Sequence, residues 1–364
     1  NRENNLGVGA SLIQSWGYFG ASISQIDKLY GVHGRDESSK IDLLQNRFDL
    51  DSLIRSPFAG FDSIRFKLGQ TEYRHTRLEQ VGRRPVDAAQ RNFTLESASI
   101  GALWRFTPGY GLGSTVSLAQ RAPTPEELYS AGPHHPTETY DKGTSSLGKE
   151  TSQNIDLSLQ KTEDKLRWKA NVFQNKVSNF IYGRLGEDVC ADTGLAPSGG
   201  TCASLGLGEA LRTRTFSQNN ATQRGYEVEV SYKLHEYGWF GRAFADDSRG
   251  TLDNLGYLPL QPVMRVGTTV GYQDANWRSS LSILNASSQT RIANANVSNE
   301  TTTRGYTRVD ANISWRQRIG ENELTWFASA RNLLNEEIRL STSLLKDYVP
   351  QPGRNFIVGV RARF

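Results

Sequence analysis

The chain has 364 residues, with 42 Lys and Arg against 38 Asp and Glu, and 37% of its residues are hydrophobic. No stretch approaches the roughly 18–20 consecutive apolar residues of a membrane-spanning helix, which excludes a helical membrane protein. The net charge of +4 is small and the basic residues are dispersed, so nothing indicates a nucleic-acid partner.

Most of the chain alternates between apolar and polar residues, as β-strands with one dry and one wet face do. The alternation is strict over residues 226–234, and the same phase recurs at 155–160, 166–172 and 309–316. We predict about fifteen such strands. In chain order they are centred near residues 10, 22, 46, 68, 102, 115, 156, 172, 229, 242, 268, 281, 312, 328 and 359.

The predicted connections alternate between short turns and long polar loops. The long loops are expected at 30–40, 121–150, 184–221, 248–261, 287–304 and 338–353. Transmembrane β-barrels have short turns on one side of the membrane, long loops on the other and aromatic girdles at both interfaces. A large soluble β-sandwich would also alternate, but the loop asymmetry, the aromatic residues beside the turns and the terminal Phe364 favour a membrane barrel.

Several stretches resemble the TonB-dependent outer-membrane receptors. Residues 119–129 and 147–155 resemble the segments that flank a long extracellular loop, and residues 330–335, 352–356 and Phe364 resemble the C-terminal hairpin. The resemblance implies an all-β fold, a transmembrane antiparallel β-barrel of the 22-stranded type in the outer membrane of a Gram-negative bacterium. It also implies a monomer, surrounded by outer-membrane lipid and lipopolysaccharide, that is driven by the TonB–ExbB–ExbD complex through an N-terminal region.

We interpret residues 1–364 as one partial receptor barrel. About fifteen strands are roughly seven fewer than 22, and the N-terminal plug of the family is absent. Near residues 79–84 the chain passes from a stretch that resembles an ascending strand to one that resembles a later loop. We therefore expect about four strands to be missing at this junction and about three before Asn1.

Within the family, residues 30–33, 41–50 and 127–140 resemble a branch of zinc receptors called ZnuD. The resemblance implies zinc as the transported ligand and places His134 where that branch has a loop histidine implicated in zinc binding. The loop after His33 lacks the run of histidines of that branch. Heme or a metal–siderophore chelate is therefore an alternative ligand.

The candidate zinc ligands lie in two predicted extracellular loops. His134, His135, Glu138 and Asp141 share one loop, and His33 lies in the other. Zinc is usually held by about four nitrogen, oxygen or sulfur ligands, and the plug could supply those that are missing here. The alternative is a solvated polar loop whose histidines bind nothing.

The chain has two cysteines, Cys190 and Cys202, in a stretch rich in Gly, Ala and Ser. In an oxidising compartment we expect them to form a disulfide that closes an extracellular loop; in a reducing one they would be free thiols. No catalytic or phosphate-binding motif occurs, so we predict neither an enzyme nor a required cofactor. A passive porin-like channel and an adhesin are the alternatives to active import.

Overall fold

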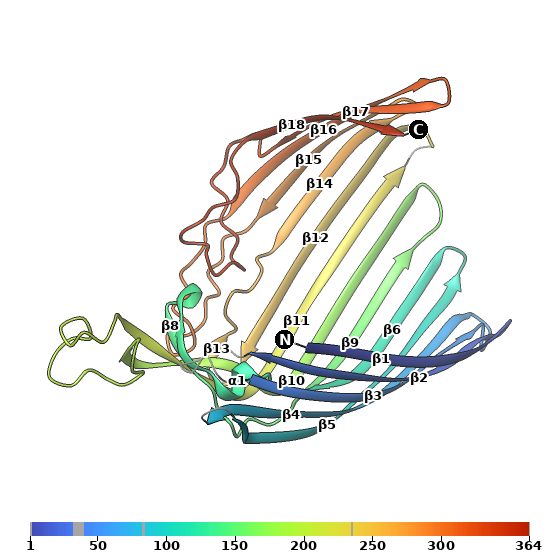
Figure 1. The fold of residues 1–364 in the computed structure, drawn as a ribbon. Coiled ribbons are helices and arrows are strands. Elements are labelled where there is room, and N and C mark those ends of the chain that lie inside the picture. The colour runs from blue at the N-terminus through green and yellow to red at the C-terminus, as the bar shows by residue number, and fades with distance from the viewer. Residues whose placement is uncertain (1, 32–39, 82–83, 234–235, 364) are drawn as a thin grey trace.

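The computed structural model describes residues 2–31, 40–81, 84–233 and 236–363, and this part of the chain forms one sheet of 18 strands. The sheet curves into an open trough, with β1 to β5 along one side and β14 to β18 along the other (Figure 1). Among the described residues, no helix is long and apolar enough to cross a membrane.

Fifteen of the described strands are long, since three of the 18 have only two to four residues. Each of the fifteen predicted centres lies within one of the long strands, so this prediction is confirmed. The long strands are β1 (Arg2–Gln14), β2 (Gly17–Gly31), β3 (Lys40–Arg55), β4 (Phe61–Val81), β5 (Arg84–Thr107), β6 (Tyr110–Arg121), β9 (Glu150–Lys161), β10 (Leu166–Cys190), β11 (Ala210–Lys233), β12 (Gly238–Leu252), β14 (Arg265–Gln273), β15 (Trp277–Ala286), β16 (Tyr306–Ile319), β17 (Asn322–Arg331) and β18 (Asn355–Arg363). The short elements are helix α1 (Pro125–Tyr129), β7 (Ala131–His134), the 3₁₀ turn η1 (His135–Thr137), β8 (Thr139–Lys142) and β13 (Gly256–Tyr257).

Each long strand pairs antiparallel with the next long strand along the chain. Thus β6 pairs with β9 and β12 with β14, because the short elements between them lie in the connections. In the part of the chain that the structure describes, no register joins β1 to β18, and these two strands lie at the edges of the trough (Figure 1).

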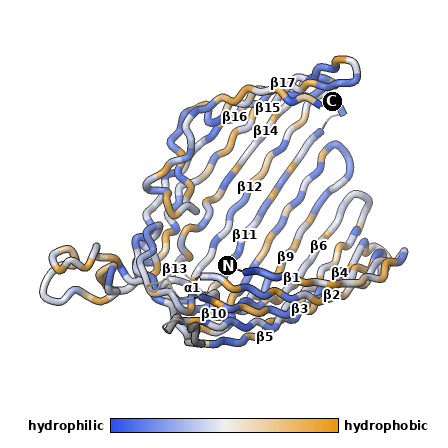
Figure 2. The backbone as a smooth tube through the Cα atoms, viewed as in Figure 1, coloured by the Kyte–Doolittle hydropathy of each residue, from blue (hydrophilic) through white to orange (hydrophobic). Residues whose placement is uncertain are grey.

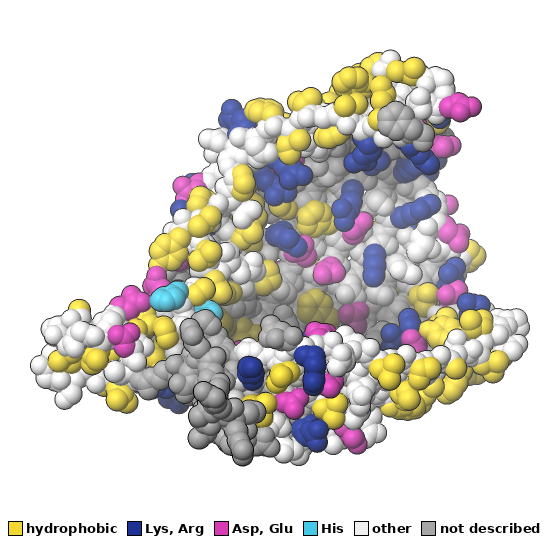
Figure 3. All heavy atoms as spheres, in the orientation of Figure 1, with side chains coloured by type: hydrophobic (Ala, Val, Ile, Leu, Met, Phe, Trp, Pro, Cys, Tyr) yellow, Lys and Arg dark blue, Asp and Glu magenta, His cyan; other side chains and the backbone are white. Residues whose placement is uncertain are grey.

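Hydrophilic and hydrophobic residues alternate along the strands (Figure 2), so the two faces of the sheet differ in polarity. On β11, the apolar side chains of Tyr226, Val228 and Val230 are 36–38% exposed, whereas Glu227 and Glu229 line a depression on the opposite face. Lys, Arg, Asp and Glu side chains gather in the hollow of the trough (Figure 3). A sheet with an exposed apolar outer face and a polar inner face has the polarity of a transmembrane barrel wall.

β10 and β11 reach further into the connection between them than the sequence predicted. β10 ends at Cys190 and β11 begins at Ala210, so the connection is 191–209, shorter than the expected loop 184–221. Register irregularities on β10, between Val177 and Phe180 and between Leu185 and Asp188, interrupt the period-two pattern there, although strand pairing still satisfies the backbone N–H and C=O groups.

At the junction near residues 79–84, β4 and β5 pair directly as neighbouring antiparallel strands. The absence of strands between them stays a prediction.

Candidate functional site at the mouth of the trough

The predicted loop 121–150 contains the short helix α1, which the sequence analysis missed. Thr124 is its N-cap: the Thr124 hydroxyl accepts a hydrogen bond from the Glu127 amide at 3.3 Å, and the Glu127 carboxylate accepts one from the Thr124 amide at 2.8 Å. Pro125 occupies the first helical position. The sequence Thr-Pro-Glu-Glu is the signature of such a capping box and could have revealed the helix.

Helix α1 lies against the inner face of the trough. The hydroxyl of Tyr129 is 3.2 Å from Nε2 of His75, a fully buried residue of β4. His75 shares its face of β4 with Arg65 and Lys67, since alternate residues of a strand point the same way. Burial raises the pKa of the Tyr129 hydroxyl, which keeps it a neutral hydrogen-bonding group. The connection from β6 to β9 therefore folds inward over the wall.

Arg121, at the end of β6, holds α1 to the wall. Its guanidinium donates two hydrogen bonds to Glu127 of the helix, at 2.9 and 3.1 Å, and one to Glu150 of β9 at 2.7 Å. Glu150 also accepts a hydrogen bond from the Ile181 amide of β10 at 2.5 Å. One arginine thus connects the helix to two strands of the sheet.

The hairpin of β7 and β8 is anchored by Asp141, one of the predicted zinc ligands. β8 pairs in parallel with the start of β11, and this register places Asp141 opposite Arg214. The Arg214 guanidinium donates two hydrogen bonds to the Asp141 carboxylate, one of them at 2.9 Å, and the Thr139 hydroxyl donates another at 2.8 Å. Asp141 is therefore engaged in a structural ion pair.

The other described candidate ligands also have protein partners. His134 Nδ1 lies 2.7 Å from the Thr137 hydroxyl, and His135 Nδ1 lies 3.8 Å from a Glu209 carboxylate oxygen. Within the described residues, no group of three or more His, Cys, Asp and Glu is placed to hold a metal ion. His33 lies outside the described residues. The zinc assignment of these five positions stays a prediction.

Glu138 connects this hairpin to a loop near the C-terminus. Its carboxylate accepts a hydrogen bond from the Tyr348 hydroxyl at 2.5 Å, and this bond raises the pKa of Tyr348. The two residues line a cavity of about 250 Å³ to which residues 297–300 and 343–344 also contribute. This hydrogen bond therefore joins the connection between β6 and β9 to the connection between β17 and β18.

The predicted disulfide is present between Cys190 and Cys202, in the connection between β10 and β11. This connection projects away from the sheet (Figure 1). A crosslink over a separation of 12 residues restricts the conformations of the loop, and both cysteines are buried within it.

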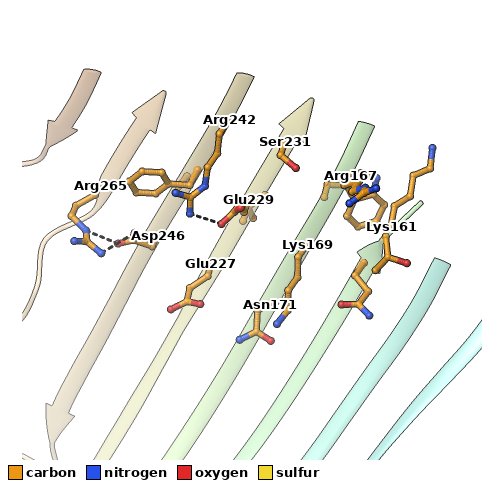
Figure 4. Close-up of a pocket in the computed structure, with 16 residues that line it drawn as sticks. Lys161, Arg167, Lys169, Asn171, Glu227, Glu229, Ser231, Arg242, Asp246 and Arg265 are labelled. Carbon is orange, nitrogen blue, oxygen red and sulfur yellow. Dashed lines mark hydrogen bonds and ion pairs between the residues drawn. The ribbon is translucent and has the colours of Figure 1, made fainter. Parts of the chain in front are cut away.

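Further along the inner wall, a depression of about 710 Å³ lies over β9 to β14 (Figure 4). Arg242 donates a hydrogen bond to Glu229 at 2.6 Å, and Arg265 makes two with Asp246, at 3.0 and 3.1 Å. The lining has five basic residues against three acidic ones: Lys161, Arg167, Lys169, Arg242 and Arg265 against Glu227, Glu229 and Asp246. The sequence analysis did not identify this surface, although its residues occupy the polar positions of alternating strands.

The sequence matches a protein family described as "TonB dependent receptor-like, beta-barrel" over residues 12–333. Among solved structures, it is similar to the copper transporter OprC, with a TM-score of 0.73, 16% identity and coverage of 98% of this chain and 56% of that one. It is also similar to the FrpB iron transporter from Neisseria meningitidis, with a TM-score of 0.65, 13% identity and coverage of 98% and 55%. For the siderophore receptor PirA from Pseudomonas aeruginosa the values are 0.59, 14%, 100% and 64%. The chain thus spans between 55% and 64% of the length of these structures.

Proposed function

Because the chain belongs to the TonB-dependent receptor-like β-barrel family, we propose that it is part of an active transporter that captures a scarce metal ligand outside the cell. The barrels of this family are Gram-negative outer-membrane proteins, and they are transporters and receptors rather than enzymes. The observation that carries the proposal is the family match over residues 12–333. These residues form a wall with an apolar outer face and a charged inner face. Energy would come from the TonB–ExbB–ExbD complex.

We propose a metal chelate, such as heme or a ferric siderophore, in preference to a bare zinc ion. Asp141 and Glu138 are committed to Arg214 and Tyr348, and His134 contacts Thr137. A chelate brings its own metal ligands and needs only hydrogen bonds, charge complementarity and apolar contact from the protein. The excess of basic over acidic side chains in the wall depression suits an anionic complex.

Calorimetric titration of the full-length protein in detergent separates these two ligands. The probes are Zn²⁺, hemin and a ferric catecholate complex, each titrated into the wild type and the His134→Ala variant. We expect one of the two chelates to bind saturably. The affinity for Zn²⁺ is expected to be the same in the wild type and in His134→Ala.

The opposite result would establish a zinc receptor. In that result zinc binds saturably, neither chelate binds, and the zinc affinity of His134→Ala is about tenfold or more weaker. A loss of this size is expected because removing a metal ligand costs at least as much affinity as removing a group that supports a ligand. Thr137→Val, which removes the hydroxyl beside His134 and leaves the imidazole in place, is the matched control.

A further inference from the structure

Three basic residues on the outer face of the sheet form a group without acidic partners. We call Lys176 of β10, Arg224 of β11 and Arg249 of β12 the basic patch. Arg224 lies directly opposite Arg249 in the β11–β12 register, and Lys176 lies opposite Thr222, the next residue along that face of β11. All three side chains are exposed, and within the described residues none makes a hydrogen bond or ion pair.

The basic patch lies at the extracellular edge of the apolar band. Arg224 shares its face of β11 with Tyr226, Val228 and Val230, because residues two apart point the same way. The strand enters from the long disulfide-closed connection, so Arg224 lies on the loop side of these exposed apolar residues. Long loops mark the extracellular side of outer-membrane barrels. The patch therefore lies at the level of the lipid headgroups of the outer leaflet.

Electrostatics favour an anion at this surface. Like charges that lie directly opposite across a strand pair are destabilising. Asp247, the nearest carboxylate on the same face of β12, is paired with Arg291 through two hydrogen bonds at 2.6 and 3.2 Å. It is therefore not available to neutralise Arg224 and Arg249.

The corresponding level of β4, on another side of the sheet, is not basic. On β4, the outward-facing residues directly above Phe66 and Leu68 are Gln70 and Glu72, and Gln70 lies opposite Glu96 of β5. At this level β4 thus carries no basic side chain and is followed by the single Arg74, whereas β11 and β12 place two arginines directly opposite each other.

We propose that the basic patch binds the phosphate groups of a lipopolysaccharide molecule in the outer leaflet. An arginine guanidinium matches a phosphate with two parallel hydrogen bonds, and two opposed arginines provide two such forks. The acyl chains would lie along Val172, Val228 and Val230, which are exposed on the same face below the patch. The proposal depends on the outer-membrane location alone and is independent of the imported ligand.

Native mass spectrometry of the full-length protein in detergent tests the proposal. Rough-type lipopolysaccharide, the same lipid after phosphatase treatment, and inorganic phosphate are titrated into the wild type, Arg224→Gln/Arg249→Gln and Arg74→Gln. Arg74 is the matched control, since it is an exposed arginine on the outward face of β4 two residues from Glu72. We expect the double variant and the phosphatase treatment each to weaken lipid binding about tenfold or more, and Arg74→Gln to leave it unchanged.

Equal lipid binding by the wild type and the double variant would overturn the proposal. So would inorganic phosphate that binds as tightly as the lipid, because the site would then recognise a free anion. Should the double variant fail to fold, Arg224→Lys/Arg249→Lys retains the charge without the fork. That variant is expected to bind the lipid with intermediate affinity, and wild-type affinity would contradict the role of the guanidinium groups.

Discussion

Replacing Arg121 with alanine is expected to release helix α1 from the wall of the trough. The substitution removes the three hydrogen bonds to Glu127 and Glu150, whose side chains are only 16% and 11% exposed. Two largely buried carboxylates would then face each other without a cation, at a cost of about 2–3 kcal/mol. In hydrogen exchange, the amides of residues 126–130 should exchange about 30- to 100-fold faster.

Arg105→Ala is the control for this prediction. Arg105 pairs with Asp62 at 2.9 Å, but these side chains are 53% and 38% exposed, and such pairs contribute about 0–1 kcal/mol. Unchanged exchange of α1 in Arg121→Ala would show that packing of the helix, and not the arginine, holds it in place.

Replacing Asp141 with alanine is expected to detach β8 from β11. The parallel pairing between these strands is four residues long, and the Asp141–Arg214 pair is the ion pair within it. The substitution leaves Arg214, 22% exposed, without its carboxylate, which costs roughly 3 kcal/mol. Faster hydrogen exchange of the amides of residues 139–142 and new proteolytic cleavage in this hairpin are the measurements.

Two further variants make this prediction specific. Asp141→Ala/Arg214→Ala should be less damaging than the sum of its two single substitutions, because it leaves no charge unpaired. Asp164→Ala removes an acid that is 72% exposed and pairs with Lys161, and it should leave β8 unaffected. An additive double variant would contradict the coupling of Asp141 to Arg214.

The fifteen long strands were predictable because each has one face against lipid and one against a polar interior. Val228 and Glu229 on β11 show the contrast that makes the period of two visible. Residues 184–190 and 210–221 are strand but were predicted as loop, because register irregularities on β10, the last between Leu185 and Asp188, interrupt the period of two. Pairing between strands determined the structure there.

The candidate site was less predictable, because its contacts join residues far apart in the chain. The disulfide required only two cysteines, 12 positions apart in one predicted loop. In contrast, Glu138 and Tyr348 are 210 residues apart, and Asp141 meets Arg214 only after β8 has paired with β11. Residue type alone marked His134, Glu138 and Asp141 as possible ligands but gave no information on their protein partners. The capping box at Thr124 was a local signal and could have been used.

Metal accumulation with and without functional TonB tests the central claim most directly. Cells that express the full-length protein as their sole outer-membrane receptor for metals are supplied with hemin, a ferric catecholate complex or Zn²⁺, and cell-associated iron and zinc are measured. The account predicts that one of the chelates is accumulated, and that this accumulation falls at least tenfold when TonB is absent. Accumulation that is equal with and without TonB would contradict active import and establish a passive channel.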